Sequence, residues 1–375
     1  MRGSLYHQRG LVARLFLWSS ACSRISRTAG MAISSLRGSP DEPSLRQHHQ
    51  QRKEPFNPPS NLRGLFVGSG SDGMNELESA QAVLELVESP SSGPVRVVYV
   101  GTATYDLEGP RQRQTQRLAQ QGCLIESLDI ATTPLTLSGE KLIENADVIV
   151  VSGGNTLYAM DRWKMFGVDE MFRHAMERGA VLSGGSAGAI CWFDGGHSKS
   201  MDPDMSKRVM LDGSPDRSDE SRIAPSITQG DTTDTPPSWD YIRVQGLGLL
   251  PGLLCPHHDI THTNGVLRAI DFDNMLLRHS GETGIAIDHW AALQVKGDSF
   301  TVLSLPNKEG SVLPDGTLSL DRKGKPGVWI KTVEDGKVIT QLCPTSGKLS
   351  DILSYASDIQ LDPREEDCRR INPAD

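Results

Sequence analysis

AVLSGGSAGAI, residues 180–190, is the stretch that decides the fold: a short apolar run meets a turn of small residues centred on Ser186. The turn contains G-x-S-x-G, whose glycines allow the sharp strand-to-helix turn that presents a serine hydroxyl at its apex. The amide of Ala187 then starts the next helix and is directed at the same space, where an oxyanion could bind. A plain Gly- and Ser-rich turn is the alternative, because G-x-S-x-G alone is only a moderate signal.

Strands and helices alternate in the sequence before this stretch. Strands are predicted at 62–67, 95–100, 123–128 and 147–151, and helices at 111–121, 139–145 and 157–178. Asn75, with Glu78 three residues later, is a candidate helix N-cap. The run VIVV at 148–151 has no polar alternation, which indicates a strand covered on both faces. We therefore predict an α/β fold with an open, mostly parallel sheet and helices on both faces.

The second half of the chain continues this pattern and then changes it. An apolar run at 246–255 ends in Pro256-His257, a helix is predicted at 266–277 and a strand at 284–288. Alternating runs at 291–295, 300–303, 328–333 and 338–342 around Gly-containing turns predict β-hairpins. We predict an α/β domain over 62–305, with a surface insertion at 212–237 that is a mobile loop or a substrate lid. Residues 306–375 are expected to form a β-hairpin extension with a polar tail.

Residues 1–61 are expected to lie outside the fold. The first 40 hold six arginines, eight serines and no acidic residue, a composition typical of an organelle transit peptide. Residues 41–61 are polar and Pro-rich, as in a linker. We therefore expect a mitochondrial or other organellar location. A cytoplasmic location is the alternative, because translation from Met31 would remove the segment, and a secretory signal at 11–18 is a weaker interpretation.

Composition limits the partners. A net charge of -9 with no long basic block disfavours a nucleic-acid or membrane surface, so a small peptide substrate is expected. No run approaches the length of a transmembrane helix. The six cysteines show no C-x-x-C spacing, which favours a reducing compartment and argues against zinc. Cys191 and Cys255 are expected to be packing residues. A homodimer is left open.

A serine nucleophile needs a base, and the base needs an orienting group. Of the ten histidines, His257 is best placed, because it leaves a strand at the edge where Ser186 is expected. Asp288 follows the next strand, from which a carboxylate could reach the imidazole. The competing acids are Asp194, Asp202 and Asp259.

These residues make the sequence resemble the aspartyl dipeptidases (peptidase E) and the related cyanophycinases, a family of serine peptidases on a fold like that of class I glutamine amidotransferases. The resemblance covers about residues 62–305 and rests on three blocks in fixed order: GGNT at 153–156, GSAGA at 185–189 and PH at 256–257. The order serine, histidine, acid also argues against an α/β-hydrolase esterase.

The resemblance implies a role for each matched residue. Ser186 is implied as nucleophile, His257 as base and Asp288 as the third triad member. The amides of Gly154 and Ala187 are the implied oxyanion hole. Substrate binding is implied for two further residues, Arg268 and Asn155.

The implied activity is hydrolysis of small peptides, with aspartyl dipeptides as the implied substrates and no metal or organic cofactor. Relatives often carry an aspartate thirteen to fifteen residues after the serine, where this chain has Lys199. Two alternatives stay open. A hydrolase of cyanophycin-like or isopeptide substrates would differ only in the pocket, and a catalytically silent binding protein would fit the lysine.

Overall fold

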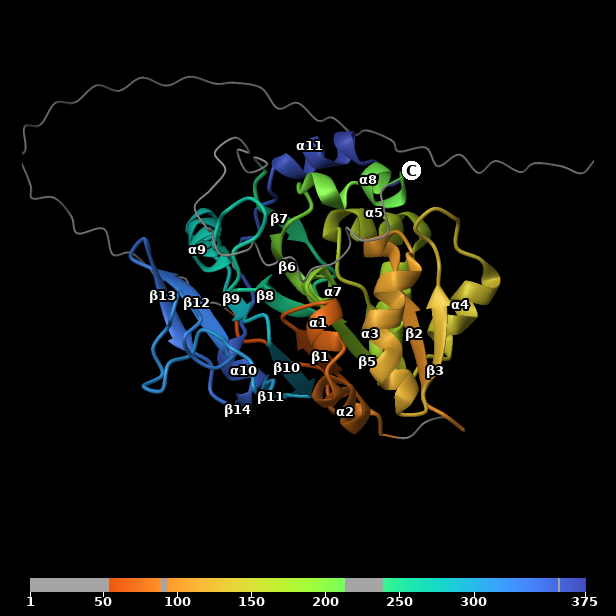
Figure 1. Cartoon of the computed structure of the whole chain (residues 1–375), viewed down its shortest axis with the longest axis horizontal. Coiled ribbons are helices and arrows are strands. Elements are labelled where there is room, and N and C mark those ends of the chain that lie inside the picture. Colours follow the sequence, from red (N-terminus) through yellow and green to blue (C-terminus); the bar gives the residue numbers. More distant parts are fainter. Residues whose placement is uncertain (1–53, 89–92, 213–238, 357) are drawn as a thin grey trace, which may run out of the picture. The chain divides into compact units, whose positions relative to one another are not determined.

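The computed structural model describes residues 54–88, 93–212, 239–356 and 358–375. The described residues belong to one compact unit, shown in Figure 1. The predicted transit segment lies outside the described residues, as does the predicted insertion except for residue 212. No helix in the described part of the chain is long and apolar enough to cross a membrane.

One of the two sheets of this unit has eight strands, in the order β14-β11-β10-β1-β5-β4-β2-β3. Five neighbouring strands are parallel: β1 (Arg63–Val67), β5 (Val181–Gly185), β4 (Val148–Val151), β2 (Arg96–Val100) and β3 (Leu124–Leu128). Three more extend it in antiparallel fashion: β10 (Ala291–Lys296), β11 (Ser299–Ser304) and β14 (Ser346–Lys348). The parallel core of the predicted sheet is confirmed.

Helices cover both faces of this sheet. One face packs against α1 (Ser71–Met74), α2 (Leu77–Leu86) and α3 (Glu108–Gln120), and the other against α4 (Leu137–Glu144), α5 (Thr156–Phe166) and α6 (Val168–Glu177). In β4, Val148 and Val150 pack in the hydrophobic cluster on the side of α1, α2 and α3. Ile149 and Val151 pack in the cluster on the side of α4, α5 and α6. The strand is therefore buried on both faces, as its unbroken apolar run predicts.

Two local helix predictions were wrong in detail. The helix expected over 157–178 is interrupted at Gly167, whose φ of 70° ends α5 in the left-handed conformation that favours glycine. Asn75 ends α1 and does not cap the next helix, since the N-cap of α2 is Glu76. The remaining short helices are η1 (Thr102–Thr104), α7 (Ala187–Ile190), η2 (Pro203–Met205), α8 (Lys207–Asp212) and α10 (Leu349–Ile352).

Six of the strands that follow the serine turn form a second sheet, whereas one sheet was expected. Its order is β13-β12-β9-β8-β6-β7, with β6 (Phe193–Ser198), β8 (Leu250–Cys255) and β9 (Gly284–Ile287) parallel, and with β7 (Ile242–Gln245), β12 (Val328–Glu334) and β13 (Lys337–Leu342) antiparallel. Helix α7 has only four residues, and this crossover is too short to bring the next strand back alongside β5 in the first sheet. The sheets share a core in which the rings of Phe66 and Phe193 meet at 5.3 Å. Helix α9 (Arg268–Arg278) covers the outer face.

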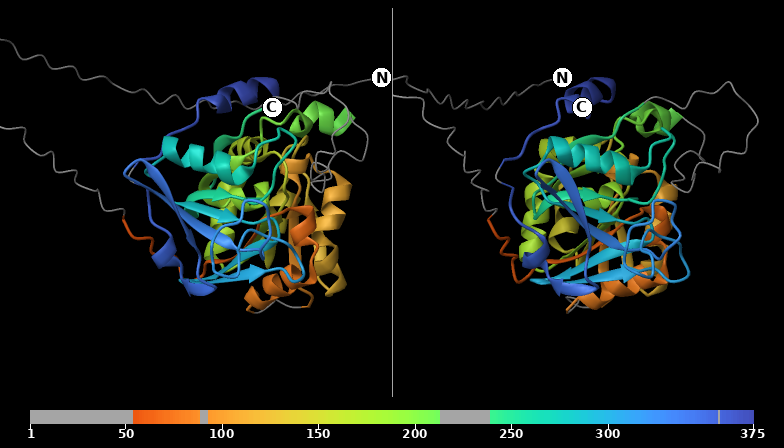
Figure 2. Two further views of the ribbon diagram at one scale, coloured as in Figure 1. Left: turned by 60° about the vertical axis from the view of Figure 1, so that its left-hand side comes forward. Right: turned by 90° about the vertical axis from the view of Figure 1, so that its left-hand side faces the viewer.

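The C-terminal region belongs to this body. The two predicted hairpins are present as β10–β11 and β12–β13. The polar tail was wrong for its last part, because residues 364–371 form α11 (Arg364–Ile371), which lies at the top of both views in Figure 2. Cys368 of this helix is buried in a cluster with Ile242 and Val244. The Asn372 side chain donates to the Tyr105 hydroxyl at 2.8 Å.

The fold begins before residue 62, so the exclusion of residues 54–61 was wrong. Phe56 is only 3% exposed and its ring meets the Tyr355 ring edge-on at 5.6 Å. The Tyr355 N–H donates to Glu54 O at 3.0 Å.

Two buried cysteines behave as predicted. Cys191 and Cys255 are free thiols that lie in hydrophobic clusters. Burial raises the pKa of Cys255 to about 12, which keeps the thiol protonated. Both residues are therefore packing residues.

Candidate active site

Ser186 sits on a strained turn between β5 and α7. Its backbone has φ 56° and ψ −122°, a conformation that a serine rarely adopts. A Cβ at Gly185 would lie 2.1 Å from Ser69 O, and one at Gly188 would lie 2.1 Å from Val151 O. Both flanking positions therefore require glycine. The predicted elbow is present, with the serine at the carboxyl edge of the first sheet.

The two amides expected to hold an oxyanion lie on neighbouring strand ends. Strands β4 and β5 pair with Val151 opposite Gly184, so the turns that follow them share one edge. Gly154 has φ 117°, and a Cβ there would lie 2.2 Å from Ala103 O. Among the described residues, neither the Gly154 N–H nor the Ala187 N–H donates a hydrogen bond. Both donors are thus free for a ligand.

His257 reaches the same edge from the second sheet. Its N–H donates to Gly68 O at 3.0 Å, while the Ser186 N–H donates to Val67 O at 3.1 Å. Two consecutive residues at the end of β1, Val67 and Gly68, therefore fix the backbones of Ser186 and His257. The structure records no hydrogen bond between the Ser186 hydroxyl and His257, and such contacts are often loose without substrate.

The imidazole of His257 is a neutral base. The ring is fully buried, and its Nε2 atom has no partner among the described residues. Burial, with the neighbouring His289 and His262, holds the pKa of His257 well below its usual value. The unprotonated form is the one that a general base requires.

Asp288 does not orient His257, contrary to the sequence-based expectation. Its Oδ2 accepts N–H bonds from Ser311 at 2.9 Å and Gly327 at 3.0 Å, and its Oδ1 lies 3.3 Å from Nδ1 of His258. Burial raises the pKa of Asp288 to about 6, opposed by the hydrogen bonds from Ser311 and Gly327. The side chain is committed to the loop between β11 and β12, which packs over the end of β9.

The competing acids also bind elsewhere. Asp194 accepts the Gly252 N–H at 3.0 Å, and Asp202 accepts the Asp204 N–H at 3.0 Å. Asp259 accepts the backbone N–H of His289 at 2.7 Å. None of these contacts is with the His257 ring.

The residue that touches His257 is a second histidine. The Nδ1 atoms of His257 and His289 lie 2.8 Å apart, and Nε2 of His289 lies 3.0 Å from Oδ2 of Asp72. Both residues were missed, because the sequence reasoning looked for a carboxylate in direct contact with the base. The available signals were that His289 follows Asp288 at a strand end and that Asp72 follows the Gly-Ser-Gly turn (68–70) after β1.

Three basic side chains lie close enough to His257 to influence its charge, and we call them the basic cluster: Lys199, His262 and Arg268. The His262 ring meets the His257 ring at 5.2 Å. The Arg268 guanidinium lies 4.8 Å from the centre of the Tyr241 ring and donates to His197 O. Burial, and then the charges of Lys199 and Arg268, hold the pKa of His262 well below its usual value. Nε of Arg268 and Nε2 of His262 are buried without a partner in the described part of the chain.

Asn155 has a structural role in place of the expected contact with substrate. Its Oδ1 accepts the Tyr158 N–H at 3.1 Å and so caps α5. Its Nδ2 donates to the Tyr105 hydroxyl at 3.1 Å and to Met205 O at 3.2 Å. Both amide hydrogens are therefore used within the protein, and neither is left for the expected contact with substrate.

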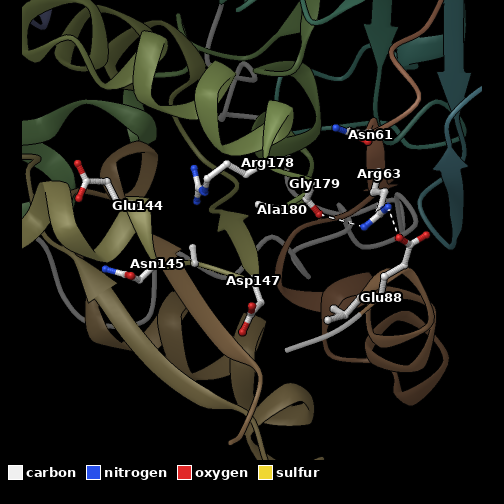
Figure 3. Close-up of a pocket in the computed structure, with 11 residues that line it drawn as sticks. Asn61, Arg63, Glu88, Glu144, Asn145, Asp147, Arg178, Gly179 and Ala180 are labelled. Atoms are coloured by element: carbon white, nitrogen blue, oxygen red, sulfur yellow. Dashed lines mark hydrogen bonds and ion pairs between the residues drawn. The ribbon is translucent and has the colours of Figure 1, made fainter. Parts of the chain in front are cut away.

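A pocket of about 530 Å³ lies away from these residues. Figure 3 shows Arg63, Asp147 and Gly179 among its lining residues, with Arg63 paired to Glu88 at 2.6 Å. These residues lie at or just before the starts of β1, β4 and β5, at the opposite edge of the sheet from Ser186. Among the described residues, no group of three or more His, Cys, Asp or Glu side chains is placed to hold a metal ion.

Comparison with known proteins finds similarity to peptidases. Residues 65–213 match peptidase family S51, a span that includes Gly154 and Ser186 and ends before His257. An uncharacterized peptidase of Bacillus subtilis (strain 168), YgaJ, is 29% identical over 164 residues, which are 44% of this chain and 55% of that protein.

Two further matches are longer. A Trypanosoma brucei brucei protein named G2/mitotic-specific cyclin-1 is 27% identical over 332 residues, 83% of this chain and 94% of that protein. The crystal structure of a peptidase from an acI-B1 Actinobacterium has a TM-score of 0.46 at 15% identity and covers 76% of this chain and 96% of that one. At that score the likeness adds nothing to the fold described above.

Proposed function

We propose that this chain, whose residues 65–213 match peptidase family S51, is a serine peptidase that hydrolyses small peptides with an acidic residue beside the scissile bond, such as aspartyl dipeptides. The observation that carries the proposal is the basic cluster next to His257, where Nε of Arg268 and Nε2 of His262 are buried without a partner in the described part of the chain.

The proposed reaction proceeds through an acyl-enzyme. The Ser186 hydroxyl attacks the peptide carbonyl while Nε2 of His257 takes its proton. The resulting oxyanion accepts hydrogen bonds from the N–H groups of Gly154 and Ala187, each worth roughly 3 kcal/mol in the transition state. His257 then gives its proton to the leaving amine. Water, deprotonated by the same imidazole, hydrolyses the ester and restores Ser186.

The substrate preference follows from the cost of buried, unpaired donors. A polar group buried without a partner costs about 1–3 kcal/mol, and more when it is charged. A substrate carboxylate would accept hydrogen bonds from Arg268 and from the protonated nitrogen of His262, while Lys199 would add an attraction between opposite charges. Asp202 lies close enough to Lys199 to offset part of that charge. A neutral side chain would leave the donors unpaired.

The experiment compares aspartyl dipeptides, matched alanyl and leucyl dipeptides and a β-aspartyl peptide. Ser186→Ala should lose several orders of magnitude of kcat with its fold intact. Retention of more than about a tenth of the activity would reject the serine as nucleophile. Cleavage of the β-aspartyl peptide in preference to the aspartyl dipeptides would replace our substrate class with isopeptides.

A second variant tests the basic cluster. Arg268→Met should lower the aspartyl-over-alanyl ratio of kcat/KM by roughly 30-fold or more, the effect of about 2 kcal/mol for a buried charge pair. The ratio is measured within one variant, so partial unfolding does not change it. The matched control is Arg278→Met, an exposed arginine at the other end of α9. An unchanged ratio in Arg268→Met, or an equal fall in the control, would refute the role of the basic cluster in substrate binding.

A further inference from the structure

We propose that His289 and Asp72 together replace the triad carboxylate, so that His257 is oriented by a second histidine backed by an aspartate. This inference rests on the proposed function, since it assigns the partners of the proposed base. It begins from two contacts: 2.8 Å between the Nδ1 atoms of His257 and His289, and 3.0 Å between Nε2 of His289 and Oδ2 of Asp72.

The protons in this chain of contacts follow from donor and acceptor rules. An ionised aspartate only accepts hydrogen bonds, so Nε2 of His289 carries a hydrogen toward Asp72. A neutral imidazole has one N–H, which leaves Nδ1 of His289 as an acceptor. The facing Nδ1 of His257 must then be the donor. Nε2 of His257 is consequently unprotonated, the state that takes a proton from Ser186.

The rest of the structure agrees with this assignment. Nε2 of His257 is the atom left without a partner in the described part of the chain, as a base awaiting its serine or substrate would be. When His257 becomes an imidazolium, its Nδ1–H bond to His289 strengthens, and the Asp72 carboxylate stabilises the charge through the intervening ring. His289 and Asp72 are positioning residues, since neither contacts the reacting atoms.

His289 is itself held in place from several directions. Its backbone N–H donates to Oδ1 of Asp259 at 2.7 Å, and its carbonyl accepts from the Ser69 hydroxyl at 2.7 Å. The Trp290 ring meets its ring edge-on at 4.7 Å, and the residue is only 1% exposed. A ring fixed this firmly can hold the tautomer of its neighbour.

The kinetic test uses Asp72→Asn, His289→Glu and the double variant, with an aspartyl dipeptide as substrate. In Asp72→Asn, an amide N–H facing His289 reverses the tautomers and protonates Nε2 of His257. We expect kcat to fall by about 10²- to 10⁴-fold with KM little changed. Glu78→Gln, which removes the same charge six residues away, is the control and should leave kcat unchanged.

His289→Glu supplies the carboxylate directly to Nδ1 of His257. We expect this variant to stay within about tenfold of wild-type kcat. In the His289→Glu background, Asp72→Asn should lower kcat by less than about threefold, because His257 no longer depends on His289 and Asp72 for its orientation. A large Asp72→Asn effect that persists in the His289→Glu background, or no effect in the wild type, would overturn the proposal.

A measurement without turnover separates this inference from the proposed function. Nitrogen-15 NMR of the histidine-labelled full chain should show Nδ1 of His257 and Nε2 of His289 protonated. Protonation of Nε2 of His257 instead would refute the proposed orientation of His257 by His289 and Asp72, even if Ser186 is the nucleophile. Active Ser186→Ala together with the expected tautomers would refute the peptidase mechanism and leave the histidine pair standing.

Discussion

Replacing Asp288 by alanine should lower the free energy of unfolding and leave kcat nearly unchanged. The substitution takes the acceptor from the N–H groups of Ser311 and Gly327, which lie 2.9 and 3.0 Å from the carboxylate. Both groups are buried, so each unpaired donor costs about 1–3 kcal/mol. The expected loss is about 2–6 kcal/mol, a large share of the roughly 5–15 kcal/mol that holds a typical domain together.

Asp288→Asn should be milder. One amide oxygen can accept both backbone N–H groups, which already share Oδ2 of the aspartate. The new NH₂ group would face the Ser311 hydroxyl and Nδ1 of His258, and both can accept. The loss of stability should therefore be clearly smaller than for alanine.

Urea denaturation and kinetics together test this reasoning. With a slope of about 3 kcal/mol/M, Asp288→Ala should lower the urea midpoint by roughly 1–2 M. At a temperature where each variant is folded, kcat should stay within about threefold of wild type for both. A stable Asp288→Asn whose kcat has fallen toward ten thousand-fold would mean that Asp288 is the triad acid and that our assignment of its contacts is wrong.

Other variants test the rest of the site and the fold. His257→Ala should match the loss in Ser186→Ala, whereas His258→Ala should cost much less kcat; the opposite order would show that the base is the other histidine. Gly154→Ala, with φ 117° and its Cβ 2.2 Å from a carbonyl oxygen, should lower kcat by about 10²- to 10³-fold, and wild-type kcat would exclude this amide from the oxyanion hole. The acid limb of kcat/KM should have its midpoint below the usual histidine pKa of about 6.5, because activity needs neutral His257 and its pKa is lowered. Lys199→Met should move that midpoint upward, and a downward shift would contradict the proximity of this charge. Phe56→Ala should lower the free energy of unfolding by about 3–5 kcal/mol, measured in urea, while no change would place residues 54–61 outside the fold.

The local features of this site were predictable from the sequence. A G-x-S-x-G turn after an apolar run is encoded by neighbouring residues, since Gly185 and Gly188 leave the space in which Ser186 takes its strained conformation. The same holds for the parallel strands with unbroken apolar runs and for the two hairpins, because burial on both faces and tight turns are written in short windows.

What the tertiary structure alone decided was which side chain reaches the base. Asp288 and His289 are consecutive residues after one strand, and their order in the sequence does not say which of them faces His257. The loop carrying Ser311 and Gly327 packs over β9 and offers N–H donors to Asp288, so the carboxylate turns toward them. The next residue is left facing His257, with Asp72 behind it. The hydrogen bonds that orient Asp288 join residues 23 and 39 positions apart, and the one between His289 and Asp72 joins residues 217 positions apart. No local sequence pattern encodes contacts over such separations.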